Sequence, residues 1–192
     1  TFALRKLATG AIAMNSTFRM LVGAFALALS TSVDAAILHV RTDGSDANTG
    51  ADWAHAKATV QAAIDAAQAA DEIWVATGVY HQRIHNRVVG ETAVDVALYG
   101  AFAGTETARA QRDYLTNLTA LHGDNAGVVV SITGGAGPET RIDGFVITGG
   151  NSNGGGGISI FGSAPVIANN VIKYNMTMGP GAGIQSYAFD IA

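Results

Sequence analysis

Short runs of β-branched and aromatic residues follow one another along the second half of the chain, and glycine or asparagine bounds each of them. Such runs lie at Val128–Ile132, Phe145–Thr148 and Val171–Tyr174. Each run follows a triplet with an apolar residue first and glycine or asparagine third. The triplets begin at Leu98, Leu121, Ile142 and Ile167, with spacings of 23, 21 and 25 residues. Because glycine and asparagine adopt positive φ at low cost, the third position predicts a recurring corner of the chain.

A repeat of this length favours a solenoid over a sandwich of β-hairpins. Short strands separated by glycine also fit hairpins, but a hairpin sandwich has no reason to repeat one corner every 21–25 residues. A coil that climbs one strand spacing of about 4.8 Å per turn must repeat it. The sequence therefore predicts an all-β solenoid, a right-handed parallel β-helix of four to five coils, in which isoleucine stacks on isoleucine and asparagine on asparagine.

The last two coils extend this alignment. Val146–Ile147 matches Val171–Ile172, and Gly157–Ile158 matches Gly183–Ile184. The glycine run at 154–157 predicts another corner, because no Lys-Ser/Thr follows it as in a phosphate-binding loop. The charged segment 105–113 predicts a lateral loop between two coils.

One segment, residues 53–70, has a helical pattern. Val60, Ile64 and Ala67 fall on one stripe at spacings of four and three, and Thr59 is a suitable N-cap. The open end of a solenoid exposes unpaired backbone groups and an apolar cross-section, so it needs a cover. We expect this helix to be an N-terminal capping α-helix between strands at 37–40 and 72–76.

The N-terminal region has the pattern of a signal peptide. The apolar run Met20–Leu29 follows Arg19 and precedes small polar residues. Residues 33–35 fit the cleavage rule, so we expect cleavage after Ala35, with Ala36 as the neighbouring alternative. The run is shorter than the roughly 20 residues of a membrane-spanning helix, which favours a cleaved leader over a retained anchor.

These features divide the chain into a leader at 1–35 and the N-terminal cap and first coils of the β-helix at 36–192. Residues 1–13 are consistent with translated sequence upstream of the natural start codon, which would encode Met14. A spacing of 25 residues after Ile167 puts the next corner at residue 192. We therefore expect the coils to continue in a longer protein.

Composition narrows the classes of function. Glycine supplies 24 of the 192 residues, and charged residues make up 14% against a typical value of about 25%. The absence of cysteine excludes a disulfide framework, a thiolate zinc site and a cysteine nucleophile. Eleven basic residues against fifteen acidic ones give a net charge of −4, with no basic surplus for a phosphate backbone, so no nucleic-acid partner is expected.

Several segments carry a family resemblance. His39–Gly50, Thr59–Ala67, Asp71–Tyr80 and Val96–Thr107 resemble the N-terminal block of bacterial exported β-helix proteins of the pectin-lyase-like superfamily. The Ile-x-x-Asn runs at Ile167–Asn170 and Ile172–Asn175 alternate with Gly155–Ile158 and Gly181–Ile184, and are similar to the repeats of polymorphic outer-membrane proteins. The resemblance covers residues 37–192. It implies a protein that is secreted or held at the outer membrane and cell surface, with no transmembrane helix retained in the mature segment.

The resemblance leaves two functions open, because this superfamily includes pectate lyases, polygalacturonases and alginate-modifying enzymes as well as adhesins. We favour an exported scaffold for adhesion or glycan contact, whose partner is a polysaccharide or a host or cell-surface glycan. The alternative is a polysaccharide lyase or glycoside hydrolase. No set of carboxylates recurs at the spacing of one coil, so the segment itself favours the scaffold.

Three alternating polar residues are candidates for carbohydrate binding. On a strand, His81, Arg83 and His85 would share one face, suited to saccharide binding or acid/base chemistry. The two histidines would stand about 13 Å apart and could not share one metal ion. The alternative interpretation is a solvated polar face.

A second candidate is a calcium site, the one cofactor that the sequence suggests. Asp43, Asp46, Asn48 and Asp52 offer hard oxygen ligands for Ca²⁺. Their spacing departs from the EF-hand, because Ala47 takes a ligand position and Asn48 stands where that loop needs glycine. A turn held by side-chain to backbone hydrogen bonds explains the same residues.

Overall fold

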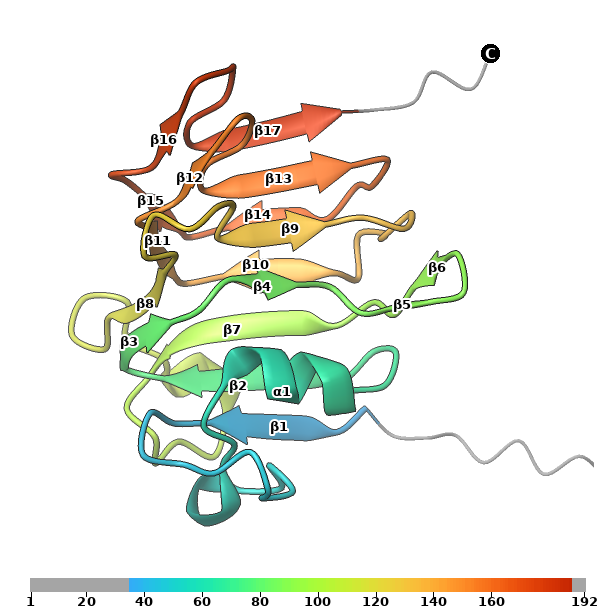
Figure 1. Cartoon of the computed structure of the whole chain (residues 1–192). Helices are drawn as coiled ribbons and strands as arrows, with labels where there is room; N and C mark the ends of the chain where they lie inside the picture. The colour runs from blue at the N-terminus through green and yellow to red at the C-terminus, as the bar shows by residue number, and fades with distance from the viewer. Residues whose placement is uncertain (1–34, 188–192) are drawn as a thin grey trace, which may run out of the picture. The chain divides into compact units, whose positions relative to one another are not determined.

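The computed structural model describes residues 35–187, whose strands wind into a right-handed parallel β-helix (Figure 1). The first sheet contains β1 (Ile37–Val40), β2 (Glu72–Ala76), β7 (Ala97–Phe102), β10 (Arg141–Asp143) and β14 (Val166–Ala168). The second contains β3 (Gly78–His81), β8 (Thr119–His122), β11 (Val146–Thr148) and β15 (Val171–Ile172). The third contains β4 (Ile84–His85), β9 (Val130–Ile132), β13 (Ile158–Phe161) and β17 (Ile184–Tyr187). All pairs within these sheets are parallel, so the predicted fold class is confirmed.

Two shorter pairings lie outside the three sheets. The strands β12 (Asn151–Ser152) and β16 (Met176–Thr177) pair in parallel at a corner between the second and third sheets. The strands β5 (Val88–Val89) and β6 (Thr92–Ala93) form a small antiparallel hairpin that projects sideways from the stack (Figure 1).

The stacking ladder of the later coils is confirmed residue by residue. Ile142 pairs with Leu98 on one side and with Ile167 on the other. Ile147 pairs with Ile172 and Ile158 with Ile184, as the alignment predicts. Except for Ile184, which is exposed at the end of the described stack, these side chains belong to one continuous apolar core that runs along the coils.

One member of the predicted ladder lies elsewhere. Leu121 belongs to the second sheet, between Tyr80 and Ile147, and does not stack on Leu98 or Ile142. The prediction was wrong because the coil between Leu98 and Ile142 contains the long lateral loop at 103–118. The insertion brings the triplet at Leu121 onto a different face of the solenoid.

The predicted corner conformation holds at the two later triplets. Gly144 has φ of +85° and Asn169 has φ of +54°. At the two earlier triplets the positive φ falls one residue later, on Ala101 (+69°) and Asp124 (+51°). Gly100 is instead required by close packing, because a Cβ there would lie 2.5 Å from the carbonyl oxygen of Gly144.

The predicted helix is present but shorter than its sequence pattern. The helix α1 spans Val60–Ala66, and the hydroxyl of Thr59 caps it by accepting a hydrogen bond from the Ala62 N–H (3.2 Å). The preceding residues do not join it, because Lys57 is extended and pairs with the backbone of His39 and Arg41 at the end of β1. Residues 53–55 form a separate 3₁₀ turn, η2 (Trp53–His55).

The helix covers the first coil by replacing a strand. In Figure 1, α1 lies next to β4, in line with the third sheet, and its apolar stripe faces the core. The Gln61 side-chain amide donates to the His85 carbonyl (3.2 Å) and accepts from the His85 N–H (2.9 Å). One glutamine therefore satisfies backbone groups of β4 that a further strand would otherwise pair.

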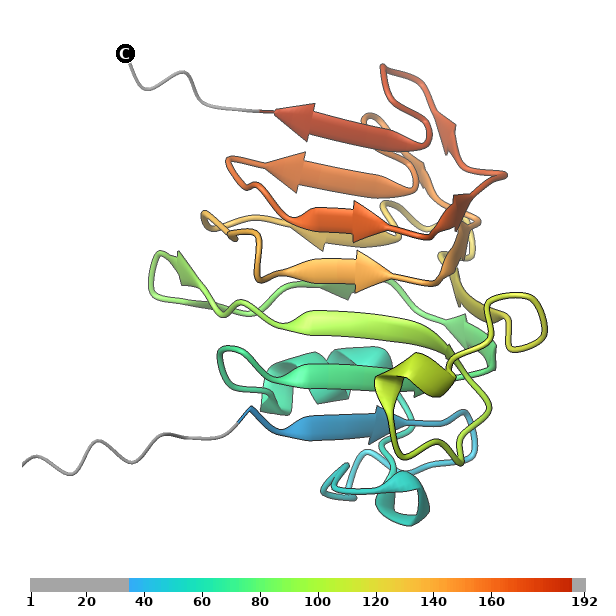
Figure 2. The ribbon, with the colours of Figure 1, turned by 180° about the vertical axis from the view of Figure 1, so that it is seen from behind.

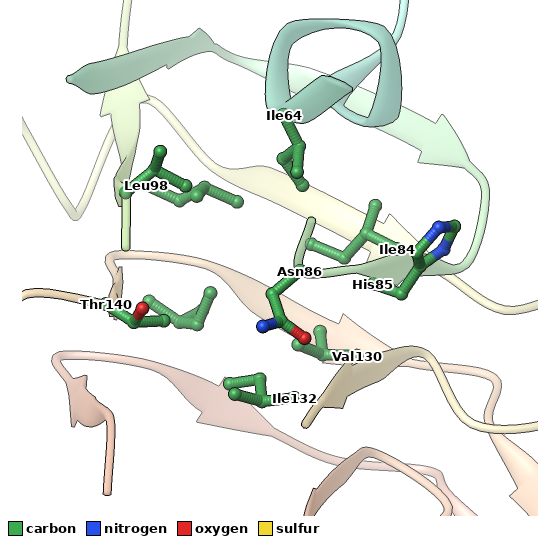
Figure 3. A pocket seen from close by; sticks show the side chains of 10 residues that line it. Ile64, Ile84, His85, Asn86, Leu98, Val130, Ile132 and Thr140 are labelled. Carbon is green, nitrogen blue, oxygen red and sulfur yellow. The ribbon is translucent and has the colours of Figure 1, made fainter. Parts of the chain in front are cut away.

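The interior under α1 is filled by side chains. A void of about 10 Å³ remains. Figure 3 shows Ile64, Ile84, Leu98 and Ile132 among the side chains that line it. This volume is at the lower limit for a single water molecule. The one amide that reaches it, on Asn86, is bonded in both directions to the backbone of Thr133 at 2.9 Å. The void is therefore a small packing defect in the core and not a ligand cavity.

The lateral loop at 103–118, which includes the 3₁₀ turn η3 (Arg109–Gln111), lies in front of the ends of β2 and β7 in Figure 2. Its main anchor is Asp143, whose side chain is 5% exposed. This carboxylate accepts from Arg112 Nη1 (3.2 Å), the Tyr114 hydroxyl (3.2 Å) and Arg141 Nη1 (3.0 Å). The buried ion pair fixes the loop to the outer face of the first sheet.

A second anchor lies within the loop itself. The carboxylate of Glu106 accepts hydrogen bonds from the backbone N–H groups of Ala103, Gly104 and Thr105. Desolvation opposes ionisation of Glu106, but these N–H groups more than offset it, so the pKa of Glu106 lies below its ordinary value.

Other sequence predictions fall outside the described part of the chain. The leader occupies residues that the structure does not describe, except Ala35, and the corner expected at residue 192 also lies beyond residue 187. Within 35–187, no helix has the length and apolar character needed to cross a membrane.

Asparagine side chains stabilise the corners between coils. Asn170 accepts from the Phe145 N–H (2.9 Å) and donates to the Ile142 carbonyl (2.7 Å). Asn175 makes the same two kinds of bond, to Gly150 and Ile147. The repeated asparagines therefore satisfy backbone groups of the preceding coil.

Replacing Asn170 with alanine should lower the free energy of unfolding by about 1–3 kcal/mol, because two backbone groups lose their partner. Asn151→Ala is the control, at an exposed position where the described structure gives the side chain no hydrogen bond; it should change stability by less than about 0.5 kcal/mol. Urea unfolding followed by circular dichroism measures both. Equal losses in the two variants would contradict a stabilising role for the corner asparagine.

Glu106→Gln should make the free energy of unfolding less dependent on pH in the acidic range. Since the pKa of Glu106 in the folded chain lies below its ordinary value of 4.5, its bonds contribute stability that is fully present above that pH. This contribution is lost as the pH falls through the folded-state pKa. Wild type should therefore be more stable than the variant at neutral pH, and the gap should close in acid. A gap that widens in acid, in unfolding curves recorded across this range, would contradict the assignment.

Candidate functional site

The three residues predicted to bind carbohydrate do not share one strand. His81 ends β3, the chain turns at Gln82–Arg83, and His85 lies on β4 in the third sheet. The single-strand prediction was wrong because a corner between two sheets falls here without a glycine to mark it. Arg83 is exposed and lies against Gly127, where a Cβ would be 2.7 Å from its Nη1. Carbohydrate binding by these residues stays a prediction.

The predicted calcium ligands make hydrogen bonds within their own turn. Asp46 accepts from the N–H groups of Ala58 and Thr59, and the Lys57 ammonium lies 2.8 Å from the Asn48 carbonyl oxygen. Asp52 caps η2 and bonds the His55 ring, and Asp43 pairs with Arg41. Within residues 35–187 the three aspartates do not converge on a common point. A calcium site in this turn stays a prediction.

The structure does bring His81 together with two residues of the next coil. In the parallel register of β3 and β8, His81 lies directly beside His122, and Asp124 follows at the corner after β8. One donor atom from each of the three side chains lies within 4.8 Å of the other two. In the described chain this is the only group of three histidine or acidic side chains that converges in this way.

The aspartate lies between the two imidazoles. Its Oδ1 is 2.8 Å from Nδ1 of His81 and 2.6 Å from Nδ1 of His122. The two rings are tilted by 46°, with centroids 5.1 Å apart. The Asp124 N–H also lies 3.1 Å from Nδ1 of His122.

The backbone around this cluster adopts unusual conformations. Asp124 and Asn125 are consecutive non-glycine residues with φ of +51° and +58°. The Asn125 N–H donates to the Gly149 carbonyl (2.7 Å), which holds the corner against the next coil. Gly149 leaves room for the His122 ring, since a Cβ there would lie 2.8 Å from Cε1 of that ring.

The cluster is open to solvent. The side chains of His81 and Asp124 are 62% and 53% exposed, and that of His122 is partly covered. Hydrogen bonds from His81 and then from His122 lower the pKa of Asp124, so the carboxylate is ionised at neutral pH. An ionised carboxylate flanked by two imidazoles can hold a cation or serve in proton transfer.

Sequence reasoning missed His122 and Asp124 because it compared histidines along one strand. The signal was present in the aligned segments 79–81 and 120–122, each an apolar pair followed by histidine. The insertion at 103–118 hid this alignment.

A polar hollow of about 370 Å³ lies on the flank of the first sheet. Its lining includes Glu72, Tyr99, Arg109, Glu139 and Arg141. Arg109 pairs with Glu72 and lies over the Tyr99 ring, with Cζ 4.6 Å from the ring centroid. Burial raises the pKa of Tyr99, so its hydroxyl, 2.9 Å from Arg109 Nη1, is protonated at neutral pH.

Comparison of the chain with protein-family models, with curated proteins and with solved structures returned no match.

Substitutions of Asp143 and Asp124 should show that the first carboxylate stabilises the fold and the second does not. Asp143→Asn should lower the free energy of unfolding by about 3 kcal/mol, because Arg112 would lose its charge partner in a buried site. Asp124→Asn should leave stability close to wild type, since the position is exposed and asparagine tolerates positive φ. Chemical denaturation of both variants tests this. A larger loss for Asp124→Asn would mean that the cluster is a structural element.

Proposed function

We propose that this chain is an exported β-helix scaffold of the pectin-lyase-like kind, whose flank binds an acidic polysaccharide at the cell surface. The observation that carries the proposal is the hollow on the first sheet, whose lining contains Arg109 and Arg141. Each guanidinium pairs with a protein carboxylate, Glu72 or Asp143, through Nη1 and keeps its other N–H donors for a ligand. Its volume of about 370 Å³ is in the range of small-molecule sites. Guanidinium groups bind carboxylates through two parallel hydrogen bonds, and an acidic sugar supplies such carboxylates.

Other features support export and a scaffold role. The apolar run at 20–29 and the small residues at 33–35 have the pattern of a cleaved leader. The repeats at 167–175 are similar to those of surface proteins. A rigid stack of in-register coils also presents polar side chains in rows, which suits contact with an extended polymer.

A second candidate function is a polysaccharide lyase or glycoside hydrolase. The cluster of His81, His122 and Asp124 favours it, because an imidazole bonded to a carboxylate is an arrangement used for general acid/base catalysis. The hollow and the cluster lie on different sheets, so variants at each can be tested separately.

Polygalacturonate and alginate should bind the protein in calorimetric titrations, and a neutral glucan should not. Arg141→Gln should weaken binding by at least about tenfold, because a charged hydrogen-bond donor is lost. Lys173→Gln is the control, an exposed cation outside the lining of the hollow, and should leave affinity unchanged. A larger loss of affinity in Arg83→Gln than in Arg141→Gln would move the binding surface to the predicted group at 81–85.

Catalysis is followed in the same mixtures through the absorbance of unsaturated ends and the release of reducing sugar. Turnover that disappears in His122→Ala would support the enzyme and overturn the scaffold proposal. Absence of both binding and turnover over a wide panel of acidic glycans would contradict both functions.

A further inference from the structure

We propose that His81, His122 and Asp124 bind one divalent transition-metal ion, with Zn²⁺ the best fit, in a site with three protein ligands. This inference goes beyond the proposed function and does not depend on it. The cluster lies on the second sheet, and its three side chains come from two successive coils.

Register is the first argument. Neighbouring strands of a parallel sheet lie about 4.8 Å apart, so two in-register histidines have their side chains at one strand spacing on the same face. This is the separation that lets two imidazoles reach one ion, whereas His81 and His85 lie on different sheets. The pairing of β3 and β8 fixes the two Cα positions, so the site needs no rearrangement of the backbone.

The distances are the second argument. Bonds of about 2.0–2.1 Å in tetrahedral geometry put ligand atoms roughly 3.3 Å apart. Asp124 Oδ1 now lies 2.8 Å and 2.6 Å from the two Nδ1 atoms. Small rotations of these side chains would therefore open the cluster enough for the ion, with the two Nδ1 atoms and one carboxylate oxygen as ligands.

The backbone conformation is the third argument. Asp124 and Asn125 adopt positive φ at the corner after β8, and the bond from the Asn125 N–H to the Gly149 carbonyl (2.7 Å) holds this corner against the next coil. The corner is therefore set by the solenoid itself, before any ion binds. Its effect is to direct the Asp124 carboxylate between both rings, while Gly149 leaves space for the His122 ring.

The ligand set selects the class of ion. Ca²⁺ and Mg²⁺ require six or more ligands, mostly oxygen atoms, and the cluster has one carboxylate. Soft ions prefer thiolates, and the chain has no cysteine. Two imidazoles and one carboxylate suit Zn²⁺ with a fourth position open, and the exposure of His81 and Asp124 leaves that position accessible to water.

The test is a calorimetric titration of tag-free, chelator-treated full-length protein with ZnCl₂ in the absence of any glycan. We expect one ion per chain. His81→Ala and His122→Ala should each weaken binding by at least about 100-fold, more than is typical for loss of an outer-shell partner. His55→Ala is the matched control, because His55 forms a similar Nδ1–Oδ1 contact with Asp52 (2.8 Å) but has no second histidine.

Two further measurements keep the test independent of folding defects. Zn²⁺ should raise the unfolding midpoint of wild type and of His55→Ala, but not that of His81→Gln, whose folding is checked by circular dichroism. Co²⁺ should give the visible absorption of a four-coordinate ion with wild type. His81→Ala and His122→Ala should not give this absorption. Absence of Zn²⁺ binding by wild type, or binding that is unchanged in both histidine variants, would overturn the proposal. Because no glycan is present, either result leaves the polysaccharide proposal to its own assay.

Discussion

In-register parallel pairing between successive coils is the constraint on which the rest of this structure depends. Each strand is bonded to the coil before it and the coil after it, so equivalent residues are held about 4.8 Å apart. Inside, this spacing requires apolar side chains to stack, as Leu98, Ile142 and Ile167 do. At the corners it brings backbone groups within reach of asparagine side chains such as Asn170. The core and the corners are therefore both products of the same register.

The same constraint explains how the chain carries insertions. A long insertion cannot enter a strand without breaking the register, so it leaves the stack sideways, as residues 103–118 do. A single extra residue is accommodated within β7, where the register with β2 shifts between Trp74 and Ala76. A loop of this kind gains nothing from the ladder and needs anchors of its own. The buried pair of Arg112 and Asp143 and the N–H groups around Glu106 supply them. Of the charged residues in this segment, Arg109 and Arg112 fix the loop to the first sheet, and Glu106 and Asp113 bond to backbone within the loop.

Local signals were sufficient for much of the fold. The Thr59 cap depends on residues within one turn, and the match of Ile142 with Ile167 depends on a coil without a long insertion. Prediction was wrong where distant segments decide the outcome. The corner at Gln82–Arg83 has no glycine, and the position of Leu121 depends on the length of the preceding loop. His81 was identified as a candidate on polar pattern, but its partners His122 and Asp124 could be found only from the register between coils.

A site on a parallel β-helix is defined by neighbours across coils more than by neighbours along the chain. His81 has His122 on the adjoining strand, and His122 has Thr148 on its other side. The row of imidazoles therefore ends after two coils, and the corner that follows β8 brings in Asp124 as the third member. Gly149, directly after Thr148, leaves space for the His122 ring in the place where a side chain would otherwise lie. The two imidazoles are consequently limited to two coils, and the geometry of the cluster depends on the pairing of β3 with β8, on the corner after β8 and on the space that Gly149 leaves.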